Sequence, residues 1–213
     1  VASTAQGDVT YSAATGSITQ NAETTANTGD IAYTAAQNIT QNAVTSIQTG
    51  NVNYLAGSNI TQNADTTVQT GNVNYLAGSN IEQNADTTTQ AGQIDYAATT
   101  GNIIVDAGMT TSTGTGAINF TAGDNIHSEI VTTGAGDITF TATNNITAGN
   151  TVGTAAGQIS FSTEQGDIET ESDATLTATS NISLAAQGNI DQNAAVASTA
   201  QGDVTYSAAT GSI

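Results

Sequence analysis

Short stretches of alternating residue type recur along this chain, and the clearest of them is residues 52–56. In its sequence, VNYLA, the first, third and fifth side chains share one face of an extended backbone, and the second and fourth share the other. Alternation with period two, together with β-branched and aromatic residues, predicts a β-strand. The surrounding residues 50–64 (GNVNYLAGSNITQNA) return as residues 71–85 with one change, from Thr61 to Glu82. The chain is therefore expected to consist of repeated short strands.

Two apolar columns repeat at the same interval and divide the chain into coils. The aromatic column, with a leucine in its ninth place, comprises Tyr11, Tyr33, Tyr54, Tyr75, Tyr96, Phe120, Phe140, Phe161, Leu184 and Tyr206. The isoleucine column comprises Ile18, Ile39, Ile60, Ile81, Ile103, Ile126, Ile146, Ile168, Ile190 and Ile213. Aromatic residues recur every 20 to 24 residues, so residues 1–195 hold nine coils of 21 to 22 residues on average. An internal period in this range indicates a solenoid.

Each coil contains three segments with strand character. The first carries the aromatic residue and mostly follows a Gly-Asx, Gly-Gln or Ser-Asn corner, the second centres on the isoleucine, and a Thr-rich third segment closes the coil. The chain has no Asn-Gly turn, which argues against hairpins, and its Gly, Thr and Asn content disfavours helices. We predict an all-β fold, a parallel β-helix with three short strands per coil. We expect right-handed coiling, because the hexapeptide repeat usual in the left-handed form is missing.

The two ends of the chain carry the same sequence. Residues 1–18 (VASTAQGDVTYSAATGSI) return without change as residues 196–213, which gives a period of 195 residues. We interpret residues 1–195 as one nine-coil unit of a continuous solenoid and residues 196–213 as the start of the next identical unit. Solenoids usually end in capping coils, whereas this pattern continues from one unit into the next. The sequence thus predicts a tandem array.

The composition argues against several classes of function. The chain has no Lys, Arg, Pro, Cys or Trp, a single His and 18 acidic residues, for a formal charge of -18. Without a basic surface to neutralise phosphates, nucleic-acid binding is not expected, and an anionic membrane surface would repel the chain. Disulfides and thiolate metal sites are excluded. No apolar run approaches the ~20 residues of a membrane span, so membrane insertion is not expected either.

A Gln-Asn pair follows the isoleucine in five coils. These pairs are Gln20-Asn21, Gln41-Asn42, Gln62-Asn63, Gln83-Asn84 and Gln192-Asn193. In register, amide side chains of one coil can hydrogen-bond to those of the next, as they do in cross-β stacks. We interpret the pairs as structural ladders, with a polar binding surface as the alternative. The motif is lost between Ile103 and Glu171, where any specific recognition would lie.

Acidic residues also fall into columns, which raises the question of bound cations. Asp8 and Asp30 follow successive corner glycines, and Asp65 and Asp86 occupy one column in adjacent coils. Asp167, Glu169, Glu171 and Asp173 alternate in sequence and are expected along one strand. Stacked like charges repel, and Ca²⁺ between rods could relieve this repulsion. Solvated outward carboxylates that keep rods apart are the favoured alternative. We assign no metal-ligating or cofactor-binding residue and expect no cofactor.

The residue pattern fits a structural role better than catalysis or ice binding. Right-handed β-helices include polysaccharide lyases, but lyase chemistry uses Arg or Lys, and this chain has neither. A paired-carboxylate hydrolase needs two acids about 5 to 9.5 Å apart in unlike environments, and nothing distinguishes Glu169 from Glu171 in this way. His127 has no recognisable partner and is expected at the surface. Ice binding needs a regular Thr array, whereas the outward positions of the aromatic strands vary. We assign no catalytic residue and expect no enzyme.

The sequence pattern of the repeats is similar to that of a known family. Residues 136–149 (GDITFTATNNITAG) and their sister coils resemble the repeats of filamentous haemagglutinins and related very large bacterial exoproteins. The resemblance implies a secreted or cell-surface β-helical shaft used in adhesion or matrix building. The complete lack of Lys and Arg departs from the family pattern.

Together these observations predict an extracellular or cell-surface structural filament built from tandem β-helical repeats. The alternatives are the shaft of a bacterial adhesin and, as a minor possibility, an ice-binding or carbohydrate-binding solenoid. The expected partners are copies of the chain itself, end to end or side by side, and any surface or matrix ligand is left unidentified.

Overall fold

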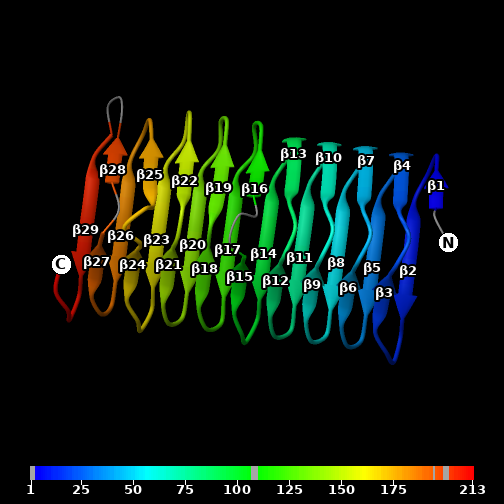
Figure 1. Cartoon of the computed structure of the whole chain (residues 1–213), viewed down its shortest axis with the longest axis horizontal. Helices are drawn as coiled ribbons and strands as arrows, with labels where there is room; N and C mark the ends of the chain where they lie inside the picture. Colours follow the sequence, from blue (N-terminus) through cyan, green and yellow to red (C-terminus); the bar gives the residue numbers. More distant parts are fainter. Residues whose placement is uncertain (1–2, 107–109, 194, 199–201) are drawn as a thin grey trace.

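Successive coils of the chain stack into a rod, with the N-terminus at one end and the C-terminus at the other (Figure 1). A computed structural model describes residues 3–106, 110–193, 195–198 and 202–213. These residues form β-strands and no helix, so none of their segments is a helix that could cross a membrane. Three parallel sheets, which we call A, B and C, each form one side of the coil. The predicted all-β solenoid with three strands per coil is confirmed, and the right-handed coiling stays a prediction.

Sheet B carries the aromatic column. Its strands are β2 (Val9–Ala13), β5 (Ile31–Ala35), β8 (Val52–Ala56), β11 (Val73–Ala77), β14 (Ile94–Ala98), β17 (Ile118–Ala122), β20 (Ile138–Ala142), β23 (Ile159–Thr163), β26 (Ile182–Ala186) and β29 (Val204–Ala208).

Sheet C carries the isoleucine column. Its strands are β3 (Ile18–Gln20), β6 (Ile39–Gln41), β9 (Ile60–Gln62), β12 (Ile81–Gln83), β15 (Ile103–Val105), β18 (Ile126–Ser128), β21 (Ile146–Ala148), β24 (Ile168–Thr170) and β27 (Ile190–Gln192).

Sheet A is formed by the Thr-rich segments. Its strands are β1 (Ser3–Ala5), β4 (Thr24–Thr28), β7 (Thr45–Thr49), β10 (Thr66–Thr70), β13 (Thr87–Ala91), β16 (Thr110–Thr113), β19 (Ile130–Thr133), β22 (Thr151–Thr154), β25 (Thr175–Ala178) and β28 (Ala195–Ser198).

Matching residues of successive coils pair directly, which produces continuous columns inside the rod. Tyr54 pairs with Tyr75, and their ring centroids lie 4.8 Å apart with an interplanar angle of 1°. Seven such parallel ring contacts, with centroids 4.6 to 5.0 Å apart, connect Tyr11 to Phe161. Ile60 likewise pairs with Ile81. Because both columns are buried from the second coil to the ninth, every coil between the ends covers the apolar side chains of its neighbours.

Glycine takes a positive φ at the corner between sheets A and B in four successive coils. Gly50 has φ +139°, a region that favours residues without a Cβ. A Cβ at this position would also collide with the carbonyl oxygen of Gly29 in the coil before it. The predicted positive-φ corner is therefore confirmed, and close stacking of the coils adds a second reason for glycine.

The stack continues into the second copy of the repeat. Strand β29, which belongs to residues 196–213, pairs in parallel with β26, and Leu184 lies opposite Tyr206. The equivalent residue of the first copy, Tyr11, pairs on its other side with Tyr33. The opening coil of a unit can therefore pair with the last coil of the unit before it and with the second coil of its own unit.

Candidate functional site

A buried polar network runs beside the aromatic column in the coils that contain tyrosine. In the third of these coils the hydroxyl oxygen of Tyr54 lies 3.1 Å from that of Thr66. The Thr66 hydroxyl donates to the side-chain oxygen of Gln41, 3.2 Å away. All three residues are at most 1 % exposed. Since the only hydroxyl proton of Thr66 goes to Gln41, the Tyr54 hydroxyl must donate to Thr66.

The same Tyr–Thr contact recurs along the column and stops where the aromatic residue becomes phenylalanine. The pairs are Tyr11–Thr24, Tyr33–Thr45, Tyr54–Thr66, Tyr75–Thr87 and Tyr96–Thr111. In the next coil Phe120 stands in the aromatic place, and Val131 takes the place of the threonine. We call the coils from Tyr11 to Tyr96 the tyrosine coils and those from Phe120 to Phe161 the phenylalanine coils. Tyrosine and its threonine partner are replaced in the same coil, so no phenol loses its threonine partner at this switch.

The two residues of the Gln-Asn pairs have different surroundings. Gln62 is buried, and its amide donates to the carbonyl oxygens of Ala64 and Asp86. Asn63 points outward and donates to Asn42 in the coil before it, 2.9 Å away. The expected amide ladder is therefore confirmed for Asn21, Asn42, Asn63 and Asn84 and wrong for the buried glutamines. A glutamine side chain inside the coil reaches the next coil's backbone before it reaches the next glutamine.

Tyr54 and Tyr75, in the middle of the network, are held in the neutral form. Burial, which removes water from the phenolate, holds the pKa of Tyr54 and Tyr75 well above the usual value for a phenol. The neighbouring tyrosines raise the pKa further, and hydrogen bonds with threonine hydroxyls oppose the shift only in part. With both rings 1 % exposed, these groups stabilise the core and do not face a ligand.

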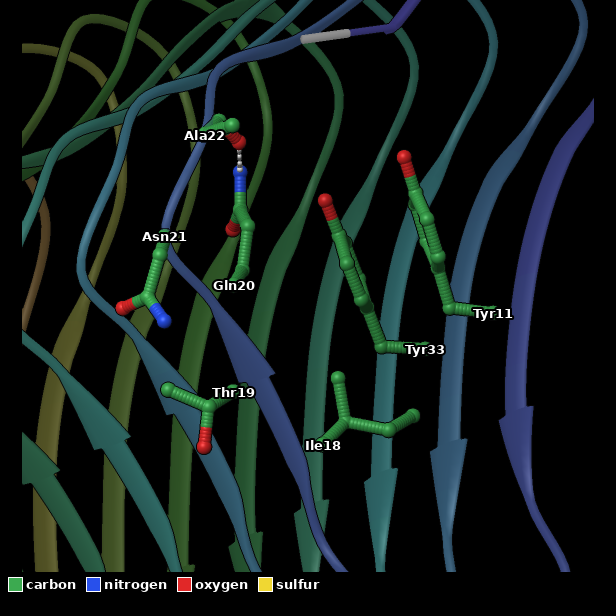
Figure 2. A pocket seen from close by; sticks show the side chains of 7 residues that line it. All are labelled: Tyr11, Ile18, Thr19, Gln20, Asn21, Ala22 and Tyr33. Carbon is green, nitrogen blue, oxygen red and sulfur yellow. Dashed lines mark hydrogen bonds between the residues drawn. The ribbon is translucent and has the colours of Figure 1, made fainter. Parts of the chain in front are cut away.

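A pocket of about 260 Å³ opens at the N-terminal end of the core (Figure 2). Figure 2 shows the rings of Tyr11 and Tyr33 side by side, with the Gln20 amide donating to the carbonyl oxygen of Ala22, 3.1 Å away. The remaining lining residues are Ile18, Thr19 and Asn21. These are members of the stacked columns, so the pocket is the open end of the stack. At the other boundary of the unit, Leu184 lies beside the equivalent Tyr206.

A shallow groove follows the corner between sheets B and C. Three pockets of about 390, 330 and 450 Å³ lie along it, each lined by corner asparagines and by outward residues of sheet C. The corner column is itself a ladder, in which Asn59 accepts hydrogen bonds from the backbone and side-chain nitrogens of Asn80, both 3.1 Å away. His127 lines the middle pocket and lies 3.2 Å from Glu129, a partner that sequence reasoning missed.

Carboxylates take part in the corner ladders as hydrogen-bond acceptors. Asp8 accepts from the backbone nitrogen of Asp30 at 2.8 Å, and Asp65 accepts from that of Asp86 at 3.2 Å. Backbone N–H groups thus offset part of the repulsion between stacked acids, without a cation. The described residues contain no group of three or more side chains arranged to hold a metal, and Ca²⁺ between rods stays a prediction.

The expected run of four acids along one strand is wrong. Strand β24 ends at Thr170, so it contains only Glu169, which is exposed. Glu171 lies beyond the strand, where its carbonyl oxygen accepts from the backbone nitrogen of Ala174 at 3.1 Å in a turn. These two acids therefore belong to different local structures, and no paired-carboxylate site is formed by alternation. The expectation that the chain is not an enzyme stays a prediction.

No family model, curated protein or solved structure matches this chain. The β-solenoid architecture is established by the strand pairing itself, while the resemblance to filamentous haemagglutinins stays a prediction.

Proposed function

We propose that the chain is a structural segment of an extracellular or cell-surface filament, whose role is length, stiffness and chemical resistance. The composition supports this role, because the lack of Lys, Arg and Cys removes trypsin cleavage sites and thiol oxidation. A rod without basic groups also suits an acidic, soluble surface fibre.

One observation carries the proposal, namely the pairing of β29 with β26 across the repeat boundary. All five residues of β29 pair in register with β26, from Ile182 opposite Val204 to Ala186 opposite Ala208. The backbone nitrogen of Ile190 also bonds to the carbonyl oxygen of Ser212 at 2.9 Å. Because the second copy begins as a further coil of the same rod, tandem units would extend one solenoid rather than form separate domains.

Small-angle scattering and electron microscopy of a two-unit chain test this proposal. At ~4.8 Å per coil, nine coils add about 43 Å, so a second copy of residues 1–195 should lengthen the rod by that amount at constant cross-section. A two-unit chain with a flexible Gly-Ser linker inserted at the unit boundary is the matched control, and it should show two rods at variable angles. If the direct fusion behaves like this control, the units are independent domains and the filament proposal fails.

A further inference from the structure

Two outward columns on one side of this highly charged rod carry no charge. We define the outer face of sheet A as two outward columns of residues that run along strands β4 to β25 and include the residues directly after β16, β19, β22 and β25. These are Thr25, Ser46, Thr67, Thr88, Ser112, Thr132, Gly153 and Thr177 in one column, and Asn27, Gln48, Gln69, Gln90, Gly114, Gly134, Ala155 and Thr179 in the other. All sixteen are neutral, in a chain with 18 acidic residues.

The charge-free face is where two polyanionic rods can approach with least repulsion. Acids lie at the other surfaces, for example Asp30 at the corner between sheets A and B, Asp95 on sheet B, and Glu169 on sheet C. An interface core is depleted of charged residues, and hydroxyl and amide side chains can hydrogen-bond to copies of themselves. The chemistry of this face therefore fits a second copy of the same face.

The relief of the face is self-complementary. In the second column, Gln48, Gln69 and Gln90 project from the tyrosine-coil half and are exposed. The corresponding places of the other half hold Gly114, Gly134 and Ala155, which are exposed and small. The first column adds Gly153 in the same half. One half of the face therefore carries a ridge of glutamine side chains, and the other half carries a hollow at the same position along the strands.

We infer that two rods pair through the outer face of sheet A, antiparallel, about a two-fold axis that runs along the strands between β13 and β16. This axis maps the ridge of one rod onto the hollow of the other. Gln90 then faces Gly114 of the second rod, Gln69 faces Gly134, and Gln48 faces Ala155. A two-fold interface needs such a self-complementary surface. The inference rests on the proposed filament role and adds a lateral contact to it.

The acids nearest to this face also suit the antiparallel arrangement. Glu23, Asp65 and Asp86 each directly precede a residue of the buried threonine column, at the edge of the ridge half. The same column in the other half holds the neutral residues Thr110, Ile130, Thr151 and Thr175. The two-fold axis places each acid opposite a neutral residue, so the pair brings no like charges face to face.

The face is large enough for a specific contact. Eight strands at ~4.8 Å and about five residues at ~3.3 Å give roughly 640 Å² on each rod. Two rods would bury about 1,300 Å², which lies within the range of ~1,200 to 2,000 Å² for stable interfaces. In a tandem array the same contact would recur in every unit, so affinity would rise with length.

Charge placed on the face tests whether it is the interface. Sedimentation of the 213-residue chain at about 0.15 M salt, where charges are screened beyond ~8 Å, should show a species of twice 21.2 kDa. The double variant Gln48→Glu/Gln69→Glu should weaken this dimer about a hundredfold, because unpaired carboxylates would lose their water. Gln37→Glu/Gln165→Glu, at exposed positions of the corner between sheets B and C, makes the same charge change and should leave the dimer intact.

Cross-linking tests the antiparallel register. The chain has no cysteine, so single-cysteine variants at Gln90 and at Gln48 report one position each. Across a sheet spacing of ~10 Å, the two copies of position 90 would lie one coil apart, and those of position 48 five coils, or about 24 Å, apart. A short bis-maleimide should therefore link the Gln90→Cys variant efficiently and the Gln48→Cys variant poorly.

Three results would overturn the inference, and none of them would change the result expected for the length of the two-unit rod. The first is a monomer at every soluble concentration, including a monomer that binds ice or an insoluble neutral glycan through this face. The second is equal weakening by the two charge variants, which would indicate general repulsion. The third is efficient cross-linking at position 48, which would indicate parallel rods.

Discussion

Replacing Thr66 by valine should break the buried polar network at its centre. Thr66 accepts a hydrogen bond from the Tyr54 hydroxyl and donates one to the Gln41 side-chain oxygen, at 3.1 and 3.2 Å. Valine has nearly the same shape, so Thr66→Val leaves packing in place and removes both bonds. The phenol donor and the amide acceptor would then both lie in a dry core without these partners.

The cost follows from the two polar groups left unsatisfied. A buried donor or acceptor without a partner costs about 1 to 3 kcal/mol, so Thr66→Val should lower the free energy of unfolding by about 2 to 6 kcal/mol. Tyr54→Phe removes the first donor of the relay and leaves Thr66 bonded to Gln41, so it should cost about 0.5 to 1.5 kcal/mol. In the double variant only the Gln41 oxygen is unsatisfied. The double variant should therefore be about 1 to 3 kcal/mol more stable than Thr66→Val alone.

Urea unfolding of the four proteins, followed by circular dichroism, measures this coupling. The comparison is valid if the slope of the free energy against urea stays the same in all four. Because repeat proteins can unfold in part, amide exchange in β8 and β10 should report the same order of stability locally. If the second substitution adds its own cost to the first instead of recovering stability, the relay from Tyr54 through Thr66 to Gln41 does not exist.

The remaining predictions concern pH and the corners of the coil. Burial raises the pKa of Tyr54 and Tyr75, so their contribution is complete below the unfolded-state pKa of about 10 and is lost as the pH rises further. The urea midpoint should decrease as the pH rises above that value, and it should decrease less steeply in the double variant Tyr54→Phe/Tyr75→Phe. If the midpoint decreases with pH equally steeply in both proteins, burial of these tyrosines is not the cause. Asn59→Ala should cost about 1 kcal/mol, while Asn59→Asp, which keeps the acceptor oxygen, should cost less than half as much in the same urea assay. Gly50→Ala should cost about 3 kcal/mol or abolish folding, whereas a cost below about 0.5 kcal/mol would show that the corner can relax.

Most of the fold was predictable because every coil repeats the same side-chain positions. The aromatic and isoleucine columns, the three strands and the glycine corners all follow from period and alternation. The buried position of Gln20 was also present in the alternation, since Ile18 and Gln20 flank an outward Thr19 in β3. What alternation does not specify is the hydrogen-bond partner. The Gln20 amide donates to the carbonyl oxygen of Val44 at 3.1 Å, 24 residues along the chain and one coil away.

In the less regular half of the unit, the sequence pattern predicted a longer strand than the structure contains. The segment from Asp167 to Asp173 alternates in sequence, but its strand ends at Thr170 and a turn follows. Coil lengths vary here, and alternation continues in sequence where the backbone leaves the sheet. The uncharged outer face of sheet A was not predicted from the sequence either. Its residues lie about 21 positions apart, and the property they share is that they carry no charge.

The interior and the surface of the unit change character within one coil of each other. The last tyrosine coil has Tyr96 bonded to Gln83 at 2.7 Å, and the first phenylalanine coil follows at Phe120, which pairs with Tyr96. On the outer face of sheet A, the ridge ends at Gln90 in β13 and the hollow begins at Gly114, just after β16 of the last tyrosine coil. A core change has no packing reason to alter outward side chains, because the two sets point to opposite faces of the sheet. The two changes together divide each unit into two halves with different outward residues, so an antiparallel neighbour can recognise both the direction of the rod and the position of the boundary between the halves.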